Sequence, residues 1–475
     1  RFDDQVELGY GFYYSTTSDI PRYDRLIETD ENGLPIDAEW YYGPQKWQMH
    51  NLRLKVVKAT GFFNQMKVTA AYQDYEESRV DRGFNDPRLR TRTEKVDVYS
   101  FNIDLDKELP QGNLFYGAEI LHNDVISEAI RVDQMTGEVS FPSTRYPDGG
   151  SDYTSYSTYF NYKWNIDQHF TLNTGVRYSL VQLTSRISDQ SALSFPFEEL
   201  AVDNGAFNGS LGLVYSPARN LKLNIALASG FRSPNIDDIG KVFDFSDGEV
   251  QVPNPDLEPE YSYNLEAGLE TKVNNIWEIG ITGFYTIVDN AMVRRDFQFN
   301  GQDSIVYEGE LSKVVALTNT GEAFIYGASF ESELDITKDL KINGSITWIS
   351  GEDKTNNEPL RHITPIFGRL GIDYHRSKWK TSLYSEFNGA RLREDLPPSE
   401  IDDKPFLYAQ HNTDRTKDGT PAWYTLNFKL AYELSDNFRV TGGIENIFDI
   451  HYRPSTSGIS APGRNFILAL RAKVN

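Results

Sequence analysis

Apolar and polar residues alternate along most of this chain. In the stretch 221–228, for example, Leu221, Leu223, Ile225 and Leu227 are apolar, and the residues between them are polar or small. A period of two predicts a β-strand whose two faces meet different surroundings. The same pattern recurs about eighteen times, and almost no stretch has the period of an amphipathic helix.

The connections between the predicted strands alternate in length. The strands begin near Gln5, Trp47, Met66, Thr93, Leu114, Ser155, Phe170, Phe207, Leu221, Glu260, Ile276, Val314, Leu340, Ile366, Trp379, Trp423, Phe438 and Asn465. Short links are expected at 59–65, 107–113, 165–169, 217–220, 273–275, 337–339, 376–378 and 434–437. Long links are expected at 21–46, 131–153, 186–205, 232–259, 296–313, 351–364, 390–421 and 449–464.

Short turns on one side and long loops on the other are typical of a bacterial outer-membrane β-barrel, with the short turns in the periplasm. A soluble β-sandwich has no need for short and long connections to alternate in this regular way. We therefore predict an all-β fold, a transmembrane antiparallel β-barrel. The first strand then rises out of the periplasm and the last strand descends to it.

Side-chain type agrees with this orientation. Leucine and aromatic residues of the strand 425–432 would face lipid, and Thr425, Asn427 and Lys429 would face the lumen. The strand 340–348 repeats the pattern. Tryptophans lie at strand ends, where aromatic girdles of such barrels sit, rather than mid-strand as a sandwich core would place them. They are Trp164, Trp277 and Trp379 beside short turns, and Trp348 and Trp423 toward long loops.

Composition and charge narrow the class further. The chain has 475 residues, no cysteine, 13% aromatic residues and a net charge of −22. Mean hydropathy is −0.52, and no run approaches the roughly 18 apolar residues of a membrane-spanning helix. The negative charge argues against a nucleic-acid partner. It agrees with solvated acidic loops or with divalent cations at a lipopolysaccharide surface.

Catalytic and metal-binding motifs are absent from the sequence. There is no G-x-S-x-G elbow, P-loop, G-x-G-x-x-G or H-E-x-x-H, so we expect no enzyme. The acidic residues of the loop 232–259 do not have the spacing of an EF-hand, and we interpret them as a solvated surface. They are Asp237, Asp238, Asp244, Asp247 and Glu249.

Two ordered motifs resemble those of TonB-dependent outer-membrane receptors. One is a pair of boxes that flank the loop 232–259, and the other is a closing segment near the C-terminal end. The residues that carry the resemblance are Phe231, Arg232, Pro234, Asn235, Asn254, Pro255, Asp256, Leu257, Pro259, Glu260, Asn446, Asp449, Tyr452, Pro462, Gly463 and Arg464.

This resemblance implies a barrel of about 22 strands filled by an N-terminal plug. Residues 1–475 would then be the C-terminal eighteen strands of that barrel, with the plug, the TonB-contacting segment and the first strands outside the given sequence. An even number of strands could also close alone as a porin-like channel. The chain departs from the usual pattern of such barrels in ending with Lys473-Val474-Asn475 instead of an aromatic residue.

A finer resemblance is to the haem and haemoglobin receptor branch. It rests on the segments 20–26 and 39–45, which read IPRYDRL and EWYYGPQ. That branch often carries a histidine between the two boxes for the haem iron, and none occurs between Phe231 and Leu257 here.

Histidines in other predicted extracellular loops become the candidate haem ligands, because imidazole and tyrosinate both bind haem iron. These are His362, His411 and His451. We favour His411, which lies with Tyr408 in an aromatic island of a long polar loop. The sequence does not identify a metal site of the protein itself.

The function expected from the resemblance is TonB-dependent import of a scarce iron-bearing ligand, with haem favoured as cargo and no intrinsic cofactor. Import of a ferric siderophore or cobalamin on the same scaffold is the alternative. A passive channel or a scaffold subunit of a surface assembly is an alternative of another class. The expected partners are TonB with the inner-membrane energising complex, outer-membrane lipid and lipopolysaccharide, and, as a further option, a surface lipoprotein.

Overall fold

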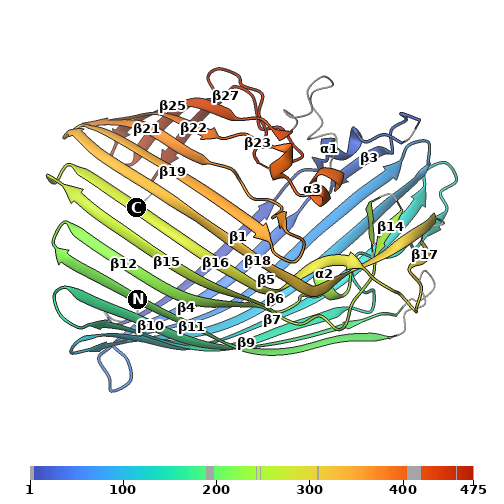
Figure 1. Cartoon of the computed structure of the whole chain (residues 1–475), viewed down its shortest axis with the longest axis horizontal. Coiled ribbons are helices and arrows are strands. Elements are labelled where there is room, and N and C mark those ends of the chain that lie inside the picture. The colour runs from blue at the N-terminus through green and yellow to red at the C-terminus, as the bar shows by residue number, and fades with distance from the viewer. Residues whose placement is uncertain are drawn as a thin grey trace.

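A computed structural model describes residues 5–473 apart from 31, 189–196, 242, 247, 308–309, 404–418 and 456. Its main feature is a single curved sheet of long antiparallel strands (Figure 1). Eighteen long strands form the wall, as the alternation predicts. They are β1 (Val6–Thr16), β4 (Lys46–Val57), β5 (Gln65–Gly83), β6 (Arg88–Leu109), β7 (Gly112–Asp133), β9 (Ser151–Asn165), β10 (Phe170–Arg186), β11 (Glu199–Ala218), β12 (Leu221–Arg232), β15 (Glu260–Val273), β16 (Trp277–Asp296), β18 (Glu310–Thr337), β19 (Leu340–Asp353), β21 (Phe367–Arg376), β22 (Trp379–Asn388), β25 (Trp423–Ser435), β26 (Phe438–Glu445) and β27 (Asn465–Ala472).

Each wall strand from β4 to β26 pairs with the wall strand before it and the wall strand after it in the chain. All eight short turns occur where they were predicted, all at one end of the barrel (Figure 1). Within the described residues, β1 pairs along its length with β4 alone and β27 with β26 alone. In the described part of the chain, the sheet therefore ends at β1 on one side and at β27 on the other.

Several strands are longer than the sequence pattern predicted. β5 and β6 continue until only 84–87 separate them, and β11 begins at Glu199 rather than near Phe207. The long link 186–205 is correspondingly wrong in its second half. Hydrogen bonding between neighbouring strands continues beyond the apolar part of the pattern because polar side chains also suit a pleated surface that faces water. As a result, β5, β6 and β7 extend well beyond the half of the barrel that holds the short turns.

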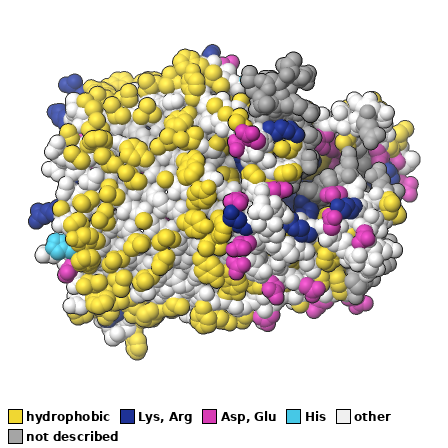
Figure 2. Space-filling view, viewed as in Figure 1, with side chains coloured by type: hydrophobic (Ala, Val, Ile, Leu, Met, Phe, Trp, Pro, Cys, Tyr) yellow, Lys and Arg dark blue, Asp and Glu magenta, His cyan; other side chains and the backbone are white. Residues whose placement is uncertain are grey.

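The outer face of the wall carries an apolar band. Val176, Leu227, Ile281 and Leu370 are exposed, and each lies between polar or small residues in the strand alternation. Figure 2 shows the hydrophobic side chains gathered over the half of the barrel that holds the short turns, and charged side chains over the other half. The predicted assignment of faces is confirmed, since Thr425 and Asn427 are buried on the inner side and Trp348 is exposed on the outer side.

The predicted long loops contain folded elements. The link 232–259 holds helix α2 (Ile236–Ile239) and strands β13 (Phe243–Ser246) and β14 (Glu249–Gln251). β14 pairs in parallel with β18, and β17 (Ser304–Tyr307) forms a hairpin with the start of β18. These strands enclose a small apolar core, and together we call them the outer lobe. The core consists of Val250, Val252, Phe299, Ile305, Tyr307, Val314 and Ala316.

Shorter elements complete the other long links. They are β2 (Ile20–Pro21), α1 (Tyr23–Leu26), β3 (Asp37–Tyr42), β8 (Val139–Ser140), β20 (Glu358–Pro359), β23 (Arg391–Leu392), the 3-10 turn η1 (Arg393–Asp395), α3 (Pro398–Asp403) and β24 (Gly419–Thr420). Across the part of the chain that is described, no helix is both long and apolar enough to cross a membrane.

Candidate functional site

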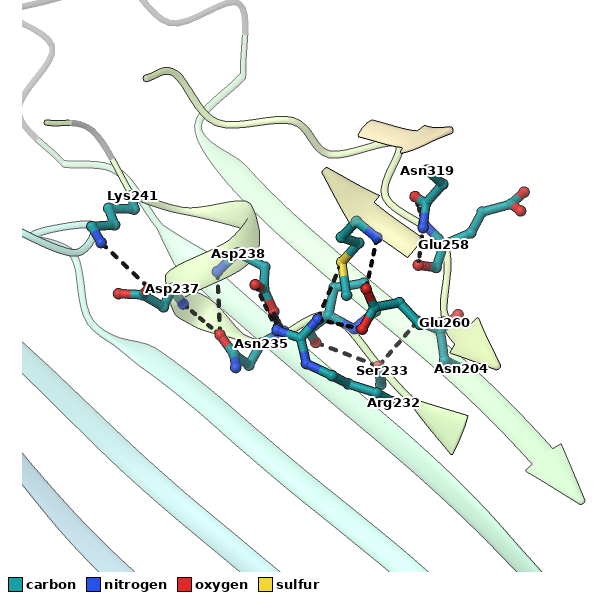
Figure 3. A network of polar contacts seen from close by, with 12 residues as sticks. Asn204, Arg232, Ser233, Asn235, Asp237, Asp238, Lys241, Glu258, Glu260 and Asn319 are labelled. Atoms are coloured by element: carbon teal, nitrogen blue, oxygen red, sulfur yellow. Dashed lines mark hydrogen bonds and ion pairs between the residues drawn. The ribbon is translucent and has the colours of Figure 1, made fainter. Parts of the chain in front are cut away.

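Arg232 is the centre of a polar network where the first box leaves the wall (Figure 3). Its Nη2 donates to both carboxylate oxygens of Asp238, at 2.7 and 2.8 Å, and its Nη1 donates to Oε2 of Glu260 at 2.8 Å. Glu260 also accepts the backbone N–H of Met292 at 2.6 Å. One guanidinium thus joins the end of β12, the start of β15 and helix α2.

Asn235 begins helix α2 with a capping box. Its side chain accepts the N–H groups of Asp237 and Asp238, and the Asp238 carboxylate accepts the N–H of Asn235 at 2.9 Å. A reciprocal cap of this kind satisfies donors that a helix start otherwise leaves without partners. Pro234 suits this position because it fixes the backbone angle where the strand pairing ends. The short helix therefore has a set place above the lumen, although it is only four residues long.

Asp237 fixes the outer side of the same helix to the neighbouring loop. Its carboxylate accepts hydrogen bonds from Arg145 and from the hydroxyl of Tyr146, both at 3.0 Å, and lies 3.4 Å from Nζ of Lys241. Burial alone would raise the pKa of Asp237, but the charges of Lys241 and Arg145 and the Tyr146 hydrogen bond hold that pKa below its usual value. Burial and the nearby Asp237 charge raise the pKa of Tyr146. The expectation that Asp237 and Asp238 are merely solvated is therefore wrong.

The second box is an anchor as well. Asn254 is buried and donates to the backbone oxygen of Leu317 at 2.7 Å while accepting the N–H of Asp256 at 3.1 Å. Asn319 exchanges hydrogen bonds with the backbone of Glu258, at 2.7 and 2.8 Å.

Leu257 completes this anchor from the apolar side. It packs into a buried cluster with Leu183, Leu200, Val202 and Ile239. The paired boxes thus fasten the loop 233–259 to the wall.

The closing segment has the same character. Asn446 is buried, accepts the N–H of Ile450 at 2.9 Å and donates to its carbonyl at 2.8 Å. Asp449 accepts the N–H of Arg464 at 2.7 Å, and the ring of Tyr452 packs at a tilt against Trp423, with ring centres 4.3 Å apart. A Cβ at Gly463 would come within 2.5 Å of the Asp449 carboxylate, which explains the glycine. Pro462 accepts a longer bond from Asn446.

A pocket of about 570 Å³ lies under the first box, on the inner face of the wall. Its roof includes Ser233 and Asn235, and its sides carry Arg177 and the hydroxyls of Ser155 and Ser157. The size is within the usual range for a small-molecule site. Ser233 and Asn235 belong to the predicted first box, whereas Arg177, Ser155 and Ser157 were not predicted as site residues, because they come from β9 and β10, outside the two boxes. The strand alternation alone places them on the lumenal side, because their sequence neighbours Tyr156 and Val176 are exposed on the outer face.

The predicted haem ligands are not brought together in the described residues. His411 and Tyr408 lie outside the described residues. His362 is exposed with a positive φ of 59°, and its backbone N–H meets Glu400 at 3.3 Å. His451 is exposed and lies 2.9 Å from the hydroxyl of Ser460. Among the described residues, no group of three or more His, Cys, Asp or Glu side chains could hold a metal ion.

A buried arginine that sequence reasoning missed organises the loops near His362. Arg391 donates to the backbone oxygens of Leu360, Ile363 and Asp395, each at 3.0 Å or less, and its Nη1 lies 3.6 Å from Glu400. It thereby ties the loop 354–364 to the segment 389–400. No local pattern predicts such a residue, since the acceptors that join the two loops are the backbone carbonyls of Leu360 and Ile363, about thirty residues earlier.

The fold and this site define the class of protein. A wide antiparallel barrel with an apolar outer band, polar inner wall and folded loops above the lumen is a large outer-membrane barrel. Comparison with protein families identifies the class more narrowly. The family model described as "TonB dependent receptor-like, beta-barrel" matches residues 1–447. The chain belongs to the TonB-dependent receptor family. It is an outer-membrane β-barrel of a transporter family, so the expectation that it is not an enzyme is confirmed.

Individual relatives are distant. Transferrin-binding protein A of Haemophilus influenzae is 23% identical over 342 residues, which cover 65% of this chain and 35% of that protein. Hemoglobin and hemoglobin-haptoglobin-binding protein A of Haemophilus influenzae is 25% identical over 253 residues, covering 51% of this chain and 22% of that protein. The chain spans about a third of the first curated relatives it matches.

Solved structures agree on the fold. The copper transporter OprC superposes with a TM-score of 0.73 at 16% identity, covering 91% of this chain and 66% of that one.

Proposed function

We propose that this chain is the barrel part of a receptor that imports an iron-bearing ligand across the outer membrane, energised by TonB. The observation that carries the proposal is the arrangement of both boxes, which hold folded loops in fixed positions above a lumenal pocket. Such a barrel needs no nucleotide site of its own, because the inner membrane supplies the energy. A plug and additional strands between the free edges of β1 and β27 would complete the barrel.

Haem is the cargo that we favour. The support is the likeness of the segments 20–26 and 39–45 to haem receptors, together with a matched relative that is named for binding hemoglobin. The structure adds that Arg22 of the first segment lies over the rings of Trp40 and Tyr42 of the second, at 5.2 and 5.5 Å. The two segments therefore form one unit. Iron of the cargo would be held by His411, Tyr408, His451 or His362.

The test uses the full-length protein. Purified receptor mixed with haem should give a shifted Soret band, and His411→Ala should weaken it, whereas Phe62→Ala at a short turn should leave it unchanged. Cells that depend on the receptor should grow on haem as iron source and stop growing when a protonophore collapses the inner-membrane gradient.

Other cargoes on the same scaffold have distinct outcomes. No band, with growth rescue by a ferric siderophore or cobalamin, would replace haem by those compounds and leave the import function standing. Growth that persists after the gradient collapses would contradict TonB-dependent import itself and favour a passive channel.

A further inference from the structure

The pocket beneath the first box contains two polar side chains that face it from neighbouring strands of the wall. They are Asn123 of β7 and Ser155 of β9. Asn123 lies opposite Tyr153 in the strand register, so Ser155 is its diagonal neighbour on the same face, with Cβ atoms roughly 7 Å apart. Within the described residues, the side-chain amide of Asn123 and the hydroxyl of Ser155 make no hydrogen bond, and Oδ1 of Asn123 is buried. A buried acceptor without a donor is costly, so this pair is open to a ligand.

The other hydroxyl and amide groups of the pocket lining already have protein partners. The hydrogen-bonded pairs are Ser151 with Ser185 at 2.6 Å, Ser157 with Ser179 at 3.2 Å, and Ser233 with Asn204 at 3.1 Å. The amide oxygen of Asn235 accepts from the first turn of helix α2. Asn123 and Ser155 are therefore the groups through which this pocket can recognise a ligand by hydrogen bonding.

Charged side chains of the lining are balanced by charges of opposite sign. The ion pairs are Arg177 with Glu119 at 3.0 Å, Arg232 with Asp238 and Glu260 at 2.7 and 2.8 Å, and Asp152 with Arg186 at 3.1 Å. A carboxylate that entered the pocket would approach the Glu119 carboxylate together with Arg177, and it has no proton to donate to the buried oxygen of Asn123. The pocket therefore favours an uncharged group.

Apolar side chains form the rest of the pocket. Val125, Val181 and Leu183 are buried along the wall, and Phe231 and Ile236 belong to the roof. The described lining contains no histidine, cysteine or glutamate, so it offers little to a metal ion. The group that fits here is apolar carbon next to one hydrogen-bonding group, and the iron of a cargo would be held elsewhere.

An amide group is the chemical complement of Asn123 and Ser155. Its N–H supplies the donor that Oδ1 of Asn123 lacks, and its carbonyl accepts from the Ser155 hydroxyl or from the Asn123 nitrogen. We propose that the pocket binds an uncharged carboxamide flanked by apolar carbon, with Asn123 as the residue that determines specificity. This inference rests on the proposed import function, since it describes the iron-free part of an imported compound. It does not depend on which side chain holds the iron.

The test titrates the full-length receptor in lipid nanodiscs with 3-phenylpropanamide and, separately, with 3-phenylpropanoate, and follows binding by ligand-observed NMR. The probes share their apolar part and differ in a carboxamide against a carboxylate. The amide should bind roughly tenfold more tightly to the wild type, the effect expected of one buried hydrogen bond. Asn123→Leu, which keeps the volume and removes the amide, should abolish this preference, and Ser155→Ala should reduce it roughly threefold. Asn173→Leu, on the lumenal face of β10 outside the pocket, is the matched control and should leave the preference within about twofold of the wild type.

The outcomes separate this inference from the import proposal. The inference is overturned if neither probe binds, if the wild type binds both equally, or if the carboxylate binds more tightly, which would assign the pocket to Arg177. It is overturned as well if Asn123→Leu and Ser155→Ala keep the full preference, or if Asn173→Leu loses it equally. An unchanged midpoint of thermal unfolding shows that the variants fold. A wild type that prefers the amide but supports growth on no iron compound would instead contradict the import proposal.

Discussion

Arg232 shows at the scale of one residue what the first box does. Its guanidinium is shared between Asp238 and Glu260, which belong to the loop and to the wall respectively. Asp238 is almost fully buried. Removing the guanidinium of Arg232 would therefore leave the Asp238 carboxylate buried, with the free-energy cost of its desolvation no longer offset by that partner. The motif is thus explained by the attachment of the loop, whatever ligand the loop meets.

We predict that Arg232→Ala loosens the loop 233–259 without unfolding the barrel. Amide hydrogens of 249–258 should exchange roughly tenfold faster, which corresponds to about 1.4 kcal/mol. Hydrogen exchange measured by mass spectrometry checks this. Arg186→Ala, which removes an exposed ion pair with Asp152, is the control and should change exchange there very little. Unchanged exchange in the Arg232 variant would show that the network does not hold the loop.

Helix α2 is the element on which the loop packing depends. It contacts the loop 141–150 through Asp237, the wall through Asp238, and the buried cluster through Ile239. A helix of four residues has no stability of its own, so its place depends on these tertiary contacts. The sequence could indicate a cap at Asn235 but not the partners Arg145 and Tyr146, which lie ninety residues earlier.

The contact between α2 and the loop 141–150 should depend on pH in a defined direction. Because the pKa of Asp237 is lower in the folded protein than its ordinary value of 3.8, its contribution is complete above about pH 4 and is lost as the pH falls further, through the folded pKa. Protease susceptibility of the loop, measured from pH 7 to pH 3, should rise only below about pH 4. In Asp237→Asn that rise should be absent, with a raised susceptibility at every pH. A rise in the wild type near pH 6 would point to another group.

The whole molecule is organised by the contrast between its two wall faces. Polar or small lumenal residues alternate with apolar outer residues along much of the wall, and hydrogen bonding between neighbouring strands satisfies the backbone within the membrane. The free edges of β1 and β27 are where this principle still requires partners, which is why we propose further strands there.

The free-energy cost of a charged side chain in the wall should depend on its depth in the membrane and on the face of the sheet that carries it. Val176→Arg, on the outer face of β10, should destabilise the barrel by about 2–4 kcal/mol, whereas Asn173→Arg on the lumenal face should cost much less. The measurement is the free energy of unfolding of the full-length protein in phospholipid vesicles. Equal costs for the two variants would contradict the assignment of faces.

The amino-acid sequence by itself determined the strands, their faces and the phase of short and long links. Each depends on a local period of two, on turn residues or on chain length. It also located the boxes around Arg232 and Asn254, whose residue types are unusual enough to stand out. Tertiary structure alone decided that these boxes are anchors, that the loop 233–259 shares a core with β17 and β18, and that a pocket opens beneath Ser233. The physical reason is that buried ion pairs, backbone acceptors and apolar cores join segments tens of residues apart, and no local pattern records which segments meet.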